Sequence, residues 1–237
     1  TSGTKEYPKL TTHFSLNMEH VHIPYPNRVL NTSMAIGGYP KIDRLIEKKI
    51  GKPIDLFFAP NPHMISLSSH IPFVFVIHDA AASLFPAVCT QKQHMWQRII
   101  DIGALTKRSS AIVVPSEHTK RDCIYWYGAS AEQIHVIAPP LPPLFSLSKE
   151  EADRMCKKRG IASRFVLSIG TIEPRKHLIA MIEAFERSGL PEQGYEYIIV
   201  GTLGWKHRAI QKRMRKSPAV RYLGYVTTEE KQALLMS

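Results

Sequence analysis

Cysteine is scarce in this chain. Its 237 residues include only Cys89, Cys123 and Cys156, and no C-x-x-C pair occurs. Three widely spaced cysteines argue against a disulfide framework or a thiolate zinc site, and favour a reducing cytoplasm. There are eleven histidines but no H-x-x-x-H motif; His20 and His22 form the closest pair. We therefore expect no metal site.

Long apolar segments and several common enzyme motifs are also absent. No window of 18 uncharged apolar residues occurs, which argues against a membrane-spanning helix, and the first residues lack the apolar core of a signal peptide. The patterns G-x-S-x-G and G-x-x-x-x-G-K-[ST] are missing. The sequence therefore gives no support to a hydrolase nucleophile elbow or to a P-loop.

Acidic residues are outnumbered by basic ones. The chain has 20 Asp and Glu against 31 Lys and Arg, a net charge of +11, which attracts nucleic acid, anionic lipid or phosphorylated ligands. No nucleic-acid motif accompanies the scattered charge, so we expect no nucleic-acid partner. The basic run 205–216 is more typical of a solvated helix face. The segment 91–108, with Trp96 among cations, is the better candidate for peripheral contact with an anionic inner membrane face, although core packing explains its apolar stripe more readily.

Apolar runs alternate with helical patterns along most of the chain. Such alternation with short connections predicts an α/β fold with parallel sheets, whose buried strands are apolar on both faces. Ser116 is a candidate helix cap, and capping-box pairs begin at Ser130, Ser148 and Thr227. The predicted strands are 54–60, 72–79, 111–116, 134–138, 165–170, 197–201 and 220–224. The predicted helices are 41–49, 91–108, 117–128, 149–160, 177–188, 205–216 and one after Thr227.

A proline-rich segment interrupts this alternation. Residues 138–145, APPLPPLF, place four prolines in five positions, which cannot lie inside a helix or a central strand. We interpret this segment as a stiff linker between two domains. The sequence therefore predicts an N-terminal domain over 1–145 and a C-terminal domain over 146–237.

The stretch 165–177, FVLSIGTIEPRKH, places two cations just after a strand that ends at Gly170. Ligands of parallel sheets bind beyond the carboxyl ends of the strands. Arg175 and Lys176, set beside a helix N-terminus, would suit a diphosphate. The alternative is a solvated pair of charges at a helix start, although cations there oppose the helix dipole.

Two further strand ends carry candidate residues. His78 and Asp79 follow the strand 72–77, where a histidine could hydrogen-bond a substrate or act as acid or base; a structural His–Asp pair is an equal alternative. Gly201, in the stretch VGTLGW, would allow a ligand to approach the backbone closely. A plain turn accounts better for Gly204.

Together these stretches resemble the GT-B glycosyltransferases, specifically the retaining family 4. The similarity rests on DLFFAPN, PFVFVIHD, AIVVPSEHTKRD, YGASAEQIHVI, VLSIGTIEPRKHLIAMIEAF, YIIVGTLGW and VRYLGYVTTEE, which cover most of 54–230 in the family's order. The family has two Rossmann-like domains with a cleft between them. A nucleotide-diphosphate sugar lies mainly on the C-terminal domain and the acceptor mainly on the N-terminal one.

The resemblance implies a role for each candidate residue. Lys176, with Arg175, Gly170 and Thr171, would bind the donor diphosphate, and Lys176 and His78 would be catalytic. Gly201 and Thr202 would approach the nucleotide. Asp79 and Ser116 would lie on the acceptor side. No catalytic metal or other cofactor is expected, because the basic pair would support the leaving diphosphate.

The implied reaction is retaining transfer of a hexosyl unit, with mannosyl as one candidate, to a glycan or lipid-linked acceptor. Thr171 departs from the arginine that many family members have there. The family's first strand with its Gly-rich loop and its E-x7-E motif are not found between residues 1 and 237, so we expect a fragment that is inactive alone. The alternative function is a non-catalytic module that binds nucleotide sugar or glycan.

Overall fold

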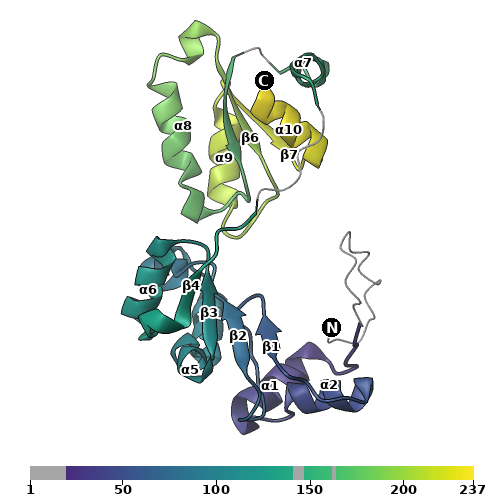
Figure 1. The fold of residues 1–237 in the computed structure, drawn as a ribbon. Coiled ribbons are helices and arrows are strands. Elements are labelled where there is room, and N and C mark those ends of the chain that lie inside the picture. The colour runs from purple at the N-terminus through teal and green to yellow at the C-terminus, as the bar shows by residue number, and fades with distance from the viewer. Residues whose placement is uncertain (1–19, 141–146, 162–163) are drawn as a thin grey trace. The chain divides into compact units, whose positions relative to one another are not determined.

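The chain divides into two compact units, residues 1–140 and 141–237. A computed structural model describes residues 20–140, 147–161 and 164–237 (Figure 1). The division falls within the proline-rich segment 138–145, whose residues 141–146 lie outside the described part. Each unit is an α/β layer structure built on a parallel sheet.

The N-terminal unit contains a four-stranded parallel sheet in the order β1-β2-β3-β4. The strands are β1 Phe57–Ala59, β2 Phe73–Val76, β3 Ala111–Val114 and β4 Ile134–Val136. Register is set by pairs such as Phe57 with Phe73 and Ile112 with Ile134. All four predicted strands are therefore confirmed, each shorter than its apolar run.

One face of this sheet forms the core of the unit. Phe73, Phe75, Ile112 and Val114 are buried against Cys123 of the helix α6 (Glu117–Tyr127). Alternate positions are less covered, and Phe58 is 54% exposed. The expectation of two fully apolar buried faces is thus wrong for this sheet, because burial alternates along its strands.

The predicted helix 91–108 is two helices. α4 (Gln91–Ile100) and α5 (Ile102–Arg108) are separated by Asp101, whose φ of 40° lies in the left-handed region. The Asp101 side chain accepts a hydrogen bond from Ala104 N at 3.0 Å and so caps α5. Asp101 therefore ends α4 and begins α5 as its N-cap. The apolar spacing of the sequence continues through this break and does not reveal it.

Of the two other helix caps predicted in this unit, one forms and one does not. Ser116 caps α6 by accepting from Thr119 N, as expected. The predicted Ser130 capping box does not form: residues 131–133 make a 3-10 turn without a side-chain cap, and Gln133 donates to Ser109 O at 2.8 Å. The unit also contains α1 Asn27–Gly37, which the sequence patterns did not reveal, α2 Ile42–Ile50, as expected, and the short α3 Ala81–Leu84 and η1 Pro86–Val88.

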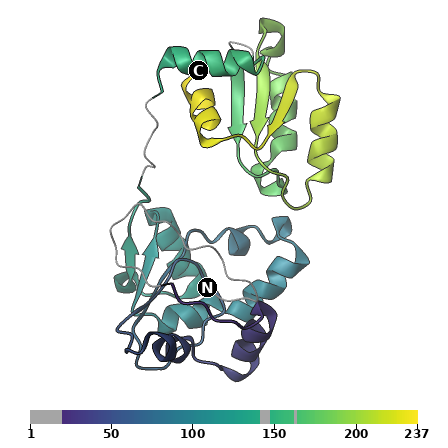
Figure 2. The same cartoon turned by 90° about the vertical axis from the view of Figure 1, so that its right-hand side faces the viewer.

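The C-terminal unit has a three-stranded parallel sheet covered on both faces. Its strands are β5 Phe165–Ile169, β6 Glu196–Val200 and β7 Val220–Gly224. Its helices are α7 Lys149–Lys158, α8 Leu178–Glu186, α9 Arg208–Lys216 and α10 Thr228–Met236, with 3-10 turns η3 Pro174–Lys176 and η4 Pro191–Gln193. α7 and α10 cover one face, and α8 and α9 cover the other (Figure 2).

The central strand β6 contributes to both cores. Ile198 and Val200 pack with α7 and α10, whereas Tyr197 and Ile199 pack with α8 and α9. This alternation explains the uninterrupted apolar run YIIV, because a strand between two helical layers has no solvent face. The predicted strands and helices of this unit are all confirmed.

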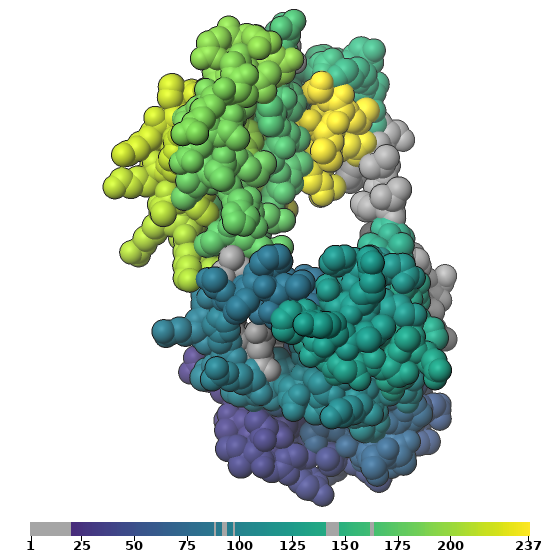
Figure 3. Space-filling view, turned by 90° about the vertical axis from the view of Figure 1, so that its left-hand side faces the viewer, coloured from purple at the N-terminus to yellow at the C-terminus, as the bar shows by residue number. Residues whose placement is uncertain are grey.

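Two helix starts in the C-terminal unit match the capping signals of the sequence. Ser148 with Glu151 and Thr227 with Glu230 each form a complete capping box. Glu230 also forms an ion pair with Arg159, which follows α7. The end of α7 is therefore tied to the start of α10. The basic side chains of α9 mostly face solvent, beside α8 on the face shown in Figure 3.

Candidate active site

Three glycines mark the carboxyl edge of the C-terminal sheet. Gly170, Gly201 and Gly224 end β5, β6 and β7, with φ values of 147°, 143° and 74°. Backbone hydrogen bonds link them in sequence across the sheet: Gly170 N donates to Val200 O at 2.9 Å, and Gly201 N donates to Gly224 O at 2.8 Å. The strand ends expected to bind the donor therefore lie side by side.

The loops after β5 and β6 remain paired beyond the strands. Ile172 N donates to Thr202 O at 2.9 Å, and Gly204 N donates to Ile172 O at 3.0 Å. A β-carbon at Gly204 would lie 2.6 Å from Thr171 Cγ2. Gly204, expected to be a plain turn residue, thus allows two loops to contact each other. Thr202 and Thr171 both have exposed side chains at this edge.

Lys176 lies over the end of β5. Its Cε and Nζ are 3.5 and 3.8 Å from the position that a β-carbon at Gly170 would occupy. Lys176, Gly170 and Thr171 line one cavity of about 200 Å³, together with Ser168 and Met181. Within the described part of the chain, the ammonium group has no hydrogen bond and no acidic partner. The structure thus brings three of the expected diphosphate residues to one cavity.

Arg175 differs from its neighbour because its charge is already paired. Its Nε donates to Glu173 Oε1 at 3.0 Å, and a guanidinium nitrogen lies 2.7 Å from the same oxygen. Glu173 is only 2% exposed. A buried carboxylate needs such a partner. The two adjacent cations are therefore unequal, and Lys176 is the one free to meet an anion.

The predicted geometry at the start of the next helix needs correction. Pro174, Arg175 and Lys176 form the 3-10 turn η3, and α8 begins only at Leu178 after His177, whose φ is 50°. The backbone N–H groups of Lys176 and His177 donate to Glu173 O and Pro174 O. The two cations lie directly before the helix start, as expected, where their charges oppose the helix dipole. These two N–H groups are not free for a phosphate.

Two tyrosines, the half-buried Tyr222 and the buried Tyr197, form hydrogen bonds at these strand ends. Tyr222 donates to Gly201 O at 2.7 Å, and burial raises the pKa of its hydroxyl, so the donor proton is retained at neutral pH. Burial likewise raises the pKa of Tyr197, whose hydroxyl lies 2.8 Å from Ser168 Oγ. Sequence patterns did not single out these tyrosines, because in a strand they read as ordinary core residues.

The expected residues of the N-terminal unit lie at the carboxyl ends of its strands. His78 is exposed, and its Nε2 lies 3.0 Å from Pro60 O. Asp79 does not pair with His78; its Oδ1 accepts from Ala81 N at 2.9 Å. Ser116 Oγ contacts both the amide and the hydroxyl of Thr119. Asp79 and Ser116 therefore shape the backbone at helix starts, whereas the ring of His78 remains accessible.

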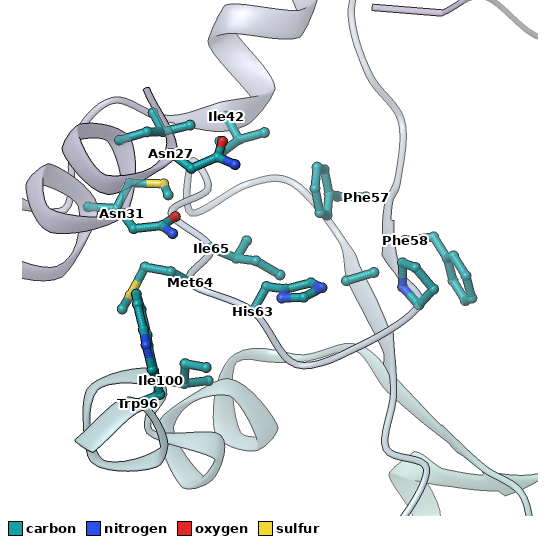
Figure 4. Close-up of a pocket in the computed structure, with 14 residues that line it drawn as sticks. Asn27, Asn31, Ile42, Phe57, Phe58, His63, Met64, Ile65, Trp96 and Ile100 are labelled. Atoms are coloured by element: carbon teal, nitrogen blue, oxygen red, sulfur yellow. The ribbon is translucent and has the colours of Figure 1, made fainter. Parts of the chain in front are cut away.

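A larger cavity in the N-terminal unit was not predicted. It measures about 540 Å³ and lies beside the end of β1, between α1, α4 and the loop 60–65 (Figure 4). Asn27, Asn31, His63 and Trp96 bring polar atoms to its lining. The sequence places Trp96 in a helix stripe, and Asn27 and Asn31 belong to the helix that the patterns missed. No spacing rule would have linked these residues.

The described residues contain neither a grouping of metal ligands nor a membrane-spanning helix. Among residues 20–140, 147–161 and 164–237, no three His, Cys, Asp or Glu side chains are grouped as metal ligands. Nor does any helix in those ranges have the length and apolar content to cross a membrane.

Solved structures with a similar fold include glycosyltransferases. HepE from Anabaena, crystallised with UDP and glucose, superposes with a TM-score of 0.59 at 17% identity, covering 81% of this chain and 52% of HepE. A glycosyltransferase from Rickettsia africae gives 0.59 at 15%, covering 90% and 56%. WaaG, a glycosyltransferase of lipopolysaccharide biosynthesis, gives 0.54 at 16%, covering 81% and 53%. The chain thus has the GT-B fold, as predicted, and spans about half the length of these structures.

Comparison of the sequence itself gives the family. A search of curated proteins found no match. The family model described as Glycosyltransferase Family 4 matches residues 4–143, more than half of the chain. This match lies on the N-terminal unit, whereas the basic strand-end motif lies on the other. The chain belongs to glycosyltransferase family 4.

Proposed function

We propose that this chain is part of a retaining glycosyltransferase. It takes a hexosyl unit, with mannosyl as one candidate, from a nucleotide-diphosphate sugar and transfers it to a glycan or lipid-linked acceptor. The family match and the glycosyltransferase fold support transfer from a nucleotide sugar. HepE binds UDP and glucose, which supports a donor of this kind.

The observation that carries the proposal is the position of the Lys176 ammonium beside Gly170, with no ion-pair partner among the residues that the structure describes. Its cavity lies at the carboxyl end of β5, where parallel sheets bind ligands. When the bond between the anomeric carbon and the diphosphate breaks, the electron pair leaves with the diphosphate oxygen. A fixed cation stabilises that charge as it develops. Lys176 is therefore the proposed catalytic cation, and Arg175 is a secondary one.

The other residues have supporting roles in this proposal. Gly170 and Thr171 line the diphosphate cavity, and the exposed loop at Gly201 and Thr202 approaches the nucleotide. His78 presents its ring at the end of the N-terminal sheet, where it hydrogen-bonds a sugar hydroxyl. Asp79 and Ser116 act on the acceptor side by fixing the backbone beside it. We propose no metal, since the lysine supplies the positive charge.

Titration calorimetry of the chain with UDP and GDP tests the donor site. Replacing a charged group that binds phosphate typically costs about 1.5–3 kcal/mol, so Lys176→Ala should weaken binding at least about tenfold. Lys212→Ala is the matched control, because Lys212 is an exposed lysine of α9 in the same unit. Equal affinities for all three proteins would contradict the phosphate-binding role of Lys176.

A transfer assay with UDP-hexoses and GDP-mannose separates enzyme from binding module. Product whose anomeric configuration matches the donor supports retaining transfer. Nucleotide binding without transfer, measured on the longest polypeptide that contains this chain, favours the non-catalytic alternative. Binding without transfer would support the donor site but contradict the catalytic role.

Peripheral contact with an anionic membrane is a separate proposal of smaller scope. Met95 and Ile99 of α4 are 54% and 41% exposed, and Arg98 is exposed on the same helix. An exposed apolar pair beside a cation suits the surface of a bilayer. Sedimentation with anionic vesicles, compared for the parent and Met95→Ser/Ile99→Ser, tests it; unchanged sedimentation would contradict it.

A further inference from the structure

The cavity beside β1 has a mixed apolar and polar lining. Phe57, Ile65 and Ile100 belong to its apolar walls, to which Trp96 adds an indole ring. In Figure 4 the amides of Asn27 and Asn31 project from α1, His63 lies on the loop across from them, and Trp96 closes one side. Concave sites of this size with a few polar groups on apolar walls are typical of small-molecule binding.

The described residues that line the cavity are uncharged. The residues that line the cavity in the described part of the chain include no Lys, Arg, Asp or Glu. The chain as a whole has a net charge of +11, so this uncharged lining differs from the basic character of the protein. An anion bound here would lose water without gaining a cation. The lining therefore selects a neutral ligand over a phosphorylated one.

Several polar groups of the lining are available to a ligand. The side chains of Asn31, His63 and Trp96 form no hydrogen bond with another residue in the described part of the chain. An amide offers two donors and an acceptor, an imidazole offers one of each when neutral, and the indole offers a donor. Three such groups around apolar walls match a molecule with an apolar face and a rim of hydroxyls.

We propose that this cavity binds a neutral hexose ring of the acceptor glycan. The ring's C–H face packs on the indole of Trp96, and its hydroxyls bond Asn31 and His63. This inference rests on the proposed function, since it names the acceptor class of the same enzyme. It favours a glycan over a lipid-linked diphosphate, because a diphosphate headgroup needs cations that this lining lacks.

Direct binding of sugars to the full chain tests the inference without donor or turnover. Methyl hexopyranosides and the corresponding disaccharides are titrated by saturation-transfer NMR or calorimetry, with decyl phosphate as the anionic probe. We expect saturable binding of at least one neutral sugar and none of decyl phosphate. Trp96→Ala should weaken sugar binding at least tenfold, and Asn31→Ala about fivefold.

Trp126→Ala is the matched control. Trp126 is an aromatic of the same unit that is 45% exposed on α6 and lies outside the cavity, so its loss should leave sugar affinity unchanged. If Trp96→Ala does not fold, Trp96→Leu and Asn31→Ala decide the matter. Absence of saturable sugar binding, equal binding by the cavity variants, or Trp96-dependent binding of decyl phosphate would overturn the inference.

The two proposals fail in different ways. Lys176→Ala lies in the other unit and should not change the affinity for neutral sugars. If UDP does not bind but sugars bind through Trp96, the donor assignment fails and the cavity assignment stands. If UDP binds through Lys176 and no neutral sugar binds, only the hexose inference fails.

Discussion

Gly201 and Gly170 touch through their backbones, because a β-carbon at Gly201 would lie 1.9 Å from the carbonyl oxygen of Gly170. The absent side chain therefore allows β5 and β6 to end side by side under Lys176. The sequence suggested that this glycine admits a ligand. The structure adds a second reason for a glycine here, because Gly201 also makes room for the neighbouring strand end beside the proposed donor cavity.

Gly201→Ala should be strongly destabilising. The added methyl collides with backbone that cannot rotate away, and a φ of 143° is open almost only to glycine. We expect a loss of at least about 2 kcal/mol in the free energy of unfolding, measured by urea with Trp205 fluorescence as the probe. Gly194→Ala is the control, since φ is 84° there but nothing lies within 4 Å. Gly194→Ala should lower the free energy of unfolding by only about 1 kcal/mol, the strain of an alanine in the left-handed region. Equal losses at both positions would show that the contact with Gly170 is not tight.

Arg175→Ala should weaken UDP binding less than Lys176→Ala does. Glu173 already neutralises much of the guanidinium charge, whereas the Lys176 ammonium is unpaired within the described residues. We expect a loss of no more than about threefold for Arg175 and at least about tenfold for Lys176 by calorimetry. A reversed order would place the main phosphate contact on Arg175.

Ser116→Ala should lower stability through the helix cap. The hydroxyl accepts from Thr119 N at the start of α6, and loss of such a cap costs about 1 kcal/mol. Urea unfolding followed by fluorescence of Trp126 measures the change. Ser130→Ala is the matched control, because Ser130 makes no side-chain cap bond, and it should change stability little. Similar losses in both variants would contradict the capping role.

Stability of the C-terminal unit should depend on pH through Glu230. The Thr227 backbone N–H and Arg159 hold the pKa of its carboxyl below the ordinary value of 4.5. A lowered folded pKa stabilises the unit fully above 4.5, and this contribution is lost as the pH falls through the folded value. Glu230→Gln should therefore lower the free energy of unfolding by about 0.5–1 kcal/mol at pH 7, and the difference from the parent should shrink as the pH falls below 4.5.

The control for this pH effect is Glu229→Gln. Glu229 lies in the same first turn of α10 but makes no ion pair in the described part of the chain. The difference in unfolding free energy between Glu229→Gln and the parent should not shrink with falling pH in the way expected for Glu230→Gln. A gap between Glu230→Gln and the parent that stays constant from pH 7 to pH 3 would contradict the role of the charge.

Much of the fold could be predicted because its signals are local. The run YIIV and the Ser148 and Thr227 capping boxes each act within a few residues of sequence. The break at Asp101 was missed because apolar spacing continues across it, while a single side chain restarts the helix. α1 was missed because it begins without a side-chain cap and follows a proline-rich start.

The candidate site was predictable only in part. Lys176 and Gly170 could be proposed from the sequence because a basic pair after a strand-end glycine is a local pattern. The burial of Glu173, which makes the two cations unequal, depends on tertiary packing. The N-terminal cavity joins Asn31, His63 and Trp96 from three separated segments. Residues that are so far apart in the sequence give no local pattern from which their grouping could be predicted.

The dual packing of β6 also constrains how this protein can evolve. Deleting or inserting one residue in the strand would send Tyr197 and Ile199 to the face that now receives Ile198 and Val200. The same slip would move Gly201 away from Gly170. Variation in length should therefore accumulate in connections such as η4, whereas the strand changes only by substitution.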